Sequence, residues 1–72
     1  MQEIRIRGDM IRLGQLLKLG GVVDAGAAAK DLLGEGEVLV NGILETRRGR
    51  QLHDGDVIEV GDWEFRVSAD SK

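Results

Sequence analysis

Three arginines lie close together in the second half of the chain, at Arg47, Arg48 and Arg50. They follow the stretch EGEVLVNGILET, in which a short apolar segment runs into Asn41-Gly42 and then returns. A guanidinium stays ionised at any working pH, and its planar N–H donors suit phosphate oxygens. The cluster therefore predicts a phosphate-binding surface, against the alternative that it is an ordinary solvated loop.

Residues that could support catalysis do not form a complete set. Ser68 and Ser71 lie near the end of the chain, and Thr46 has no histidine close to it in sequence. The only histidine, His53, stands in a turn-rich stretch, where an exposed turn residue is the expected role. Because an enzyme needs an activated nucleophile, a base or a metal, we predict no catalytic residues.

Metal and nucleotide sites are also disfavoured. The chain has no cysteine, and one histidine cannot make a zinc site without help from carboxylates. Asp54, Asp56 and Asp62 adjoin glycines, which is typical of turns rather than of metal ligands. No GxxxxGK[ST] motif is present. We therefore predict no metal and no cofactor.

Length and charge limit the possible functions further. At 72 residues the chain has room for one domain, which we place at residues 1–72. The net charge of -3 argues against nonspecific coating of nucleic acid. Any binding to nucleic acid must therefore depend on where the cations are placed. The absence of cysteine fits a reducing cytoplasm, and no apolar run approaches the roughly 18 residues of a membrane span. We expect a cytoplasmic monomer.

The first half of the chain predicts a strand and two helices. Residues 3–7 alternate polar and β-branched side chains, which favours a half-exposed strand. Asp9 is expected to cap a first helix that carries leucines on one face and ends at Gly20-Gly21. Asp24 is expected to cap a second helix with small and apolar residues at helical spacing up to Leu33. Two short helices with small residues between them should pack as a corner.

The second half predicts strands. Asn41-Gly42 should form a type I′ turn within a hairpin at residues 38–46. Residues 47–54 are expected to be a loop, followed by strands at 57–60 and 63–67 and by a frayed end at 69–72. Trp63, Phe65 and Val67 share a face and are expected in the core. The pattern indicates an α+β fold, with a two-helix corner packed on a small, mainly antiparallel sheet.

This arrangement can gather cations from separate elements. Arg12 and Lys18 fall away from the leucine face of the first helix, and Lys30 falls away from the alanine-leucine face of the second. If the hairpin packs against the helices, these three side chains and the arginine trio form one basic surface. Such a surface would follow a sugar-phosphate backbone.

Several of these residues carry a resemblance to a known family. RLGQLLKLGGVVDAGAAAKDLLGEGEVLVNG followed by LHDGDVIEV, over about residues 12–60, resembles the RNA-binding domain first seen in ribosomal protein S-four. That domain is shared by pseudouridine synthases, tyrosyl-tRNA synthetases and ribosome-associated heat-shock proteins. The stand-alone YaaA/YbcJ-like proteins of bacterial type are the most similar in length, in the Leu-Leu-Lys-Leu helix and in the Glu-Thr-Arg-Arg stretch. The resemblance implies an αL-type module that binds RNA through its helical pair and the neighbouring loop.

The chain departs from the family at the start of the second helix. Many members have Ser-Arg or Arg-Arg there, whereas this chain has Ala25-Gly26-Ala27. Gly26 could still let a phosphate approach the free amides of the helix N-terminus. We call the segment that carries Arg47, Arg48 and Arg50 the arginine loop. We hypothesise that this loop contributes more of the RNA binding here than it does in other members of the family.

These observations predict a non-enzymatic protein that binds structured RNA, such as ribosomal or transfer RNA or a ribosome-assembly intermediate. A protein-interaction module is one alternative, with a partner on the acidic C-terminal side or at the Val22-Val23 edge. A β-grasp sulfur carrier is another, although such carriers need a C-terminal Gly-Gly that this chain lacks. The predicted RNA-binding residues are Arg12, Lys18, Gly26, Lys30, Arg47, Arg48 and Arg50.

Overall fold

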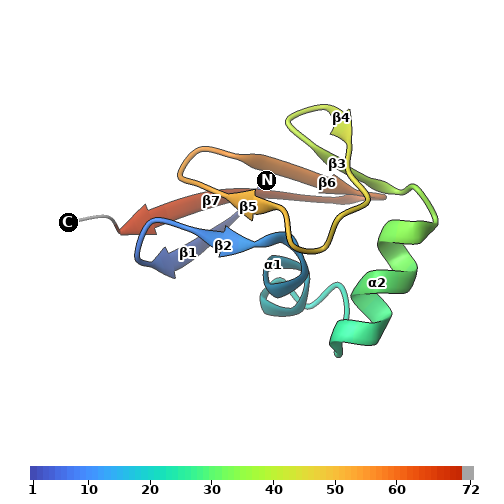
Figure 1. The fold of residues 1–72 in the computed structure, drawn as a ribbon. Coiled ribbons are helices and arrows are strands. Elements are labelled where there is room, and N and C mark those ends of the chain that lie inside the picture. The colour runs from blue at the N-terminus through green and yellow to red at the C-terminus, as the bar shows by residue number, and fades with distance from the viewer. Residues whose placement is uncertain (71–72) are drawn as a thin grey trace.

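The computed structural model describes residues 1–70, and within them two helices and seven strands (Figure 1). The helices are short and follow one another in the chain. In chain order the elements are β1 (Gln2–Arg7), β2 (Ile11–Arg12), α1 (Leu13–Leu19), α2 (Gly26–Gly34), β3 (Val38–Val40), β4 (Ile43–Leu44), β5 (Gln51–Leu52), β6 (Val57–Val60) and β7 (Trp63–Asp70).

Five of the strands form one sheet in the order β1-β7-β6-β3-β4. Neighbouring strands are antiparallel except for β1 and β7, which run parallel with Ile4 opposite Val67. The short strands β2 and β5 pair separately, with Ile11 opposite Leu52. Both helices lie on the same side of the large sheet (Figure 1). The predicted α+β fold with a helical corner and a mainly antiparallel sheet is confirmed.

The core lies between the helices and the large sheet. Alternation along β1 buries Ile4 and Ile6, and the same alternation along β7 buries Phe65 and Val67. The leucine face of α1 is fully buried against them, which is the arrangement that an amphipathic helix on a half-exposed sheet requires. The helical residues of the core are Leu13, Leu16, Leu17, Ala29 and Leu33.

The hairpin turn has the geometry that its sequence predicts. Asn41 has φ 53° and Gly42 has φ 82°, the two positive values that a type I′ turn needs. The Asn41 side chain also joins the hairpin to the start of β6, because its Nδ2 donates to Asp56 Oδ1 at 3.1 Å and its Oδ1 accepts the Val57 N–H at 2.9 Å. The turn is therefore stabilised both by its own backbone geometry and by the hydrogen bonds of the Asn41 side chain.

The predicted helix starts are wrong in both helices. Helix α1 begins at Leu13 with Arg12 as its N-cap, three residues after the predicted cap Asp9, because residues 11–12 first pair with β5. The Arg12 backbone N–H donates to Gln15 Oε1 at 3.1 Å. Helix α2 has Ala25 rather than Asp24 as its N-cap, with no side-chain hydrogen bond there. The predicted loop at residues 47–54 likewise contains β5, whose two residues give too short a pattern to detect.

Two further expectations fail near the end of the described chain. Of the three residues expected in the core, Phe65 and Val67 belong to it, whereas Trp63 stacks on Phe65 with ring centroids 5.7 Å apart but is 45% exposed. Ala69 and Asp70 were expected to fray but belong to β7, since the parallel β1 provides partners opposite them. The rest of the predicted frayed end, residues 71–72, lies outside the described residues. None of the helices in residues 1–70 is long and apolar enough to span a membrane.

Candidate nucleic-acid interface

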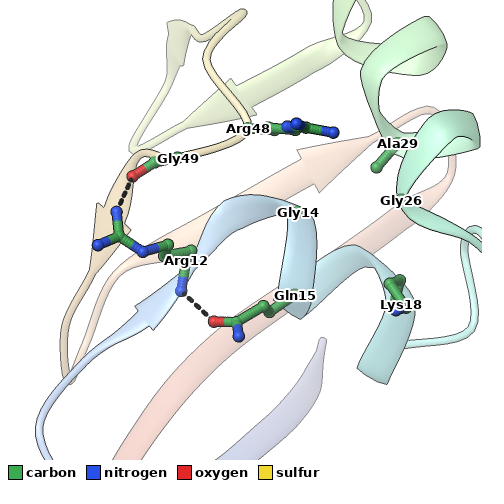
Figure 2. A pocket seen from close by; sticks show the side chains of 8 residues that line it. All are labelled: Arg12, Gly14, Gln15, Lys18, Gly26, Ala29, Arg48 and Gly49. Carbon is green, nitrogen blue, oxygen red and sulfur yellow. Dashed lines mark hydrogen bonds between the residues drawn. The ribbon is translucent and has the colours of Figure 1, made fainter.

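A hollow of about 270 Å³ lies between α1, the beginning of α2 and the loop that carries the arginines (Figure 2). Of the predicted binding residues, the structure brings Arg12, Lys18, Gly26 and Arg48 together here. Three of the lining residues are cations, and no carboxylate of residues 1–70 is part of the lining. The complete lining is Arg12, Gly14, Gln15, Lys18, Gly26, Ala29, Arg48 and Gly49.

The arginine loop is attached to the first turn of α1 through its backbone. The Leu13 N–H donates to the Arg50 carbonyl oxygen and the Gly14 N–H donates to the Arg48 carbonyl oxygen, both at 2.9 Å. Amides that a helix start leaves unpaired therefore find their acceptors in the loop. Arg12 adds a third link, because its Nη1 donates to the Gly49 carbonyl oxygen at 3.0 Å (Figure 2).

The loop lies against the helix at Gly14. A Cβ atom at position 14 would lie 3.4 Å from the Arg48 Cβ and 3.5 Å from the Arg48 carbonyl oxygen, which is ordinary van der Waals contact. The hydrogen bond from the Gly14 N–H, rather than the missing side chain, therefore holds the loop at this position. The Arg48 side chain then extends across the hollow towards α2 (Figure 2).

A buried glutamate organises the other two arginines of the loop. Glu45 is 6% exposed, and its carboxylate accepts the backbone N–H groups of Thr46 and Arg47. Oε2 also accepts Arg47 Nε at 3.0 Å, and Oε1 accepts both Arg47 Nη2 at 3.1 Å and Arg50 Nη1 at 2.8 Å. Five donors therefore converge on one carboxylate, which we call the Glu45 clamp, made of Glu45, Arg47 and Arg50.

Electrostatics within the clamp favour the charged forms. Hydrogen bonds from the side chains of Arg47 and Arg50, with one from the Arg47 backbone, hold the pKa of Glu45 well below its ordinary value despite burial. The same contact raises the pKa of Arg47. One carboxylate against two guanidiniums leaves a single net positive charge. The clamp is therefore weaker as a phosphate attractor than two free arginines would be.

The remaining predicted residues lie outside the first hollow. Arg47 and Arg50 line a second hollow of about 640 Å³ that also contains His53 and Asp56. Lys30 is exposed on α2 and lines neither hollow. His53 is an exposed turn residue, as expected, and its backbone N–H donates to Asp56 Oδ2 at 2.7 Å.

Sequence reasoning missed the residues that position the arginines. Glu45, Gln15 and Gly14 were not predicted as site residues, although the hydrogen bonds of each hold the loop or the first turn of α1 in place. A signal for Glu45 was present, since a glutamate two and five positions before arginines can fold back onto both. The burial of Glu45 could not be predicted from the sequence, because no local pattern indicates that this part of the loop packs against the rest of the protein.

Comparison with known proteins identifies the family. A model of the S4 domain matches residues 4–68. The chain is also 53% identical over 57 residues to the probable ribosome maturation protein RlbA of Bacillus subtilis (strain 168), an alignment that covers 79% of this chain and 80% of that protein. The resemblance expected from residues 12–60 thus extends over most of the chain. The protein belongs to the S4 domain family.

Proposed function

We propose that the protein is a non-enzymatic RNA-binding protein that docks on structured RNA, either ribosomal or transfer RNA or an intermediate of ribosome assembly. The observation that carries the proposal is the first hollow, where Arg12, Lys18 and Arg48 meet without a carboxylate in the lining. Membership of the S4 domain family supports RNA as the ligand, and the name of the RlbA relative supports a role in ribosome maturation.

Arg12, Lys18 and Arg48 would bind the RNA backbone through its phosphates. Guanidinium groups suit phosphate because they present parallel donors, whereas Lys18 adds a compact point charge. Arg12 already donates through Nη1 to the Gly49 carbonyl oxygen, which holds its side chain along the rim of the hollow. Its remaining donors would be oriented before the RNA arrives, so less side-chain entropy is lost on binding.

Gly26 would contribute by exposing backbone. It is the first residue of α2, and the Ala25 N-cap makes no side-chain hydrogen bond to the helix start. A Cβ at position 26 would meet no atom within 4 Å, so the space in front of this residue is open. Amides at a helix start favour an anion through their N–H groups and the helix dipole. A phosphate in the hollow could therefore reach both the cations and this helix end.

Arg47, Arg50 and Lys30 are proposed as outer contacts. The Arg47 side chain is 73% exposed despite its ion pair, so a phosphate can still approach it from the solvent side. Lys30 is exposed on α2. Because the Glu45 clamp carries one net charge, we expect these residues to add less affinity than those of the first hollow.

We expect the protein to recognise the shape and the sugar-phosphate backbone of the RNA rather than its bases. Base-stacking platforms need several exposed aromatic side chains. Within the described residues, Phe65 is fully buried and Trp63 lines a different hollow together with Met1 and Gln2. The alternative of a protein partner at the Val22-Val23 edge is weakened, since both valines pack partly against the core. S4 domain membership argues against a β-grasp sulfur carrier.

Salt-dependent binding to purified ribosomal RNA and to transfer RNA tests the proposal. With about four phosphates engaged, log K should fall with log salt at a slope of roughly -3 to -4. The double variant Arg12→Gln/Arg48→Gln should bind about tenfold more weakly, with a slope smaller by about 2. Arg66→Gln is the control, because Arg66 pairs with Glu3 at 3.7 Å and lines neither hollow. Equal affinities for the double variant and the control would refute the proposal.

A further inference from the structure

A further hollow, of about 370 Å³, lies beside the end of β1 and holds two arginines that the predicted interface does not include. Arg5 and Arg7 line it from β1, and Gln15 and Leu19 line it from α1. The lining contains no carboxylate. Its full set is Arg5, Ile6, Arg7, Met10, Ile11, Gln15 and Leu19.

The two arginines are available to a ligand. Both are exposed, and the ion pairs found among residues 1–70 involve neither of them. Arg7 lies opposite Asp70 in the register of β1 and β7 but makes no ion pair with it in the described chain. Arg5 and Arg7 therefore differ from the arginines of the Glu45 clamp, where a buried carboxylate forms ion pairs with both guanidiniums.

This hollow continues the first one along α1. Gln15 lines both, so the two hollows adjoin at this residue. Its Oε1 accepts the Arg12 backbone N–H at 3.1 Å, which fixes its position at the boundary. Cations therefore line both hollows, with Lys18, Arg48 and Arg12 in the first and Arg5 and Arg7 in the second.

The hollow also offers apolar contact. Leu19 is 59% exposed although it is a large hydrophobic residue, and Met10 lies beside it in the lining. An apolar surface flanked by guanidiniums matches a nucleotide, which combines an apolar ribose and base with a charged phosphate. Gln15 can offer its amide N–H to the same nucleotide.

We propose that bound RNA continues from the first hollow past Gln15 into this one, where Arg5 and Arg7 bind a further phosphate and Leu19 contacts the attached nucleoside. The inference rests on the proposed function. It assigns a second subsite to the same RNA and makes β1 part of the interface.

The test uses ribosomal RNA and a salt series on the full chain. Arg5→Gln/Arg7→Gln should weaken binding about three- to tenfold and make the salt slope smaller by about 1, since the one lost phosphate contact contributes about 0.9. Arg5→Lys/Arg7→Lys keeps both charges and should restore the slope. Arg66→Gln again controls for a general change in charge, and Arg7→Gln alone is measured in case the double variant is unstable.

The outcomes separate this inference from the proposed function. If Arg12→Gln/Arg48→Gln weakens binding but the β1 variants behave like Arg66→Gln, the second subsite is refuted while the first hollow stands. If the lysine variant fails to restore the slope, the β1 arginines do not act through phosphate and the inference is also refuted. If Arg12→Gln/Arg48→Gln has no effect, both proposals fail together.

Discussion

Arg48 and its neighbours Arg47 and Arg50 belong to one loop, yet the fold puts them in two different environments. The Arg48 side chain extends across a hollow whose lining holds cations and no carboxylate. Arg47 and Arg50 bind the buried carboxylate of Glu45. Residues of one type, within four positions of each other, therefore have different electrostatic surroundings.

The difference shows that charge in a loop can serve two purposes. In the clamp, two guanidiniums compensate a carboxylate that would be costly to bury alone, and they thereby fix the path of the loop. In the hollow, the guanidinium of Arg48 makes no ion pair with any of residues 1–70 and is open to a ligand. We interpret the clamp as the part that positions the loop and the hollow as the part that binds.

Removing the Glu45 carboxylate should have the largest effect. Glu45→Gln replaces an acceptor of five hydrogen bonds by an amide whose NH₂ faces guanidinium donors, so the free energy of unfolding should fall by about 2 kcal/mol. Urea unfolding measures this change. Glu64→Gln, at an exposed position, is the matched control and should stay within about 0.5 kcal/mol of the parent. Equal stabilities of the two variants would mean that the clamp does not hold the loop.

The pH dependence of stability sharpens the same prediction. The pKa of Glu45 is depressed in the folded state, so the unfolded state binds more protons once the pH approaches the ordinary glutamate pKa of about 4.3. The contribution of the clamp is fully present above that value and is lost as the pH falls towards the folded-state pKa. Stability of the parent should therefore decline more steeply below about pH 4 than stability of Glu45→Gln. Parallel profiles would contradict the clamp.

Separate substitution of Arg48 and Arg47 compares the two environments directly. Arg48→Gln should weaken RNA binding about three- to fivefold, whereas Arg47→Gln should weaken it by less than about twofold, because Arg47 is partly compensated by Glu45. Filter binding to ribosomal RNA at fixed salt measures both. A greater effect of Arg47→Gln would contradict the distinction between the two environments, since the ion pair with Glu45 would then not reduce the contribution of Arg47 to RNA binding.

A methyl group at Gly26 should have the smallest effect. The new Cβ would meet no atom of the protein within 4 Å, and replacing glycine in a helix gains up to about 1 kcal/mol, so stability should be unchanged or slightly higher. A phosphate that approaches this helix end would meet the methyl group, and affinity should fall about twofold. Gly34→Ala, also with open space around it and near the other end of α2, is the control. Equal affinities of the two variants would exclude Gly26 from the site.

Local patterns predicted much of the fold. The alternation of Ile4 and Ile6, the leucines of α1 and the positive-φ pair Asn41-Gly42 each act over a few residues, and all three predictions are confirmed. The predicted starts of the two helices were wrong, because Asp9 and Asp24 were chosen only for the intrinsic preference of aspartate for the N-cap position. Neither is the N-cap of a helix, since the pairing of residues 11–12 with β5 delays the start of α1 and Ala25 is the N-cap of α2.

For the site, the sequence by itself determined which cations exist and that Lys18 and Lys30 fall on the polar faces of short helices. Arg12, expected on the first helix, instead ends β2 and is the N-cap of α1. The sequence also carried enough of the S4 pattern to indicate the family. Only the tertiary structure decided that Arg48 joins Arg12 and Lys18 at one hollow while Glu45 captures Arg47 and Arg50. The physical reason is that helical periodicity is a local property, whereas the pairing of a charge depends on which buried carboxylate the folded chain brings within hydrogen-bond distance.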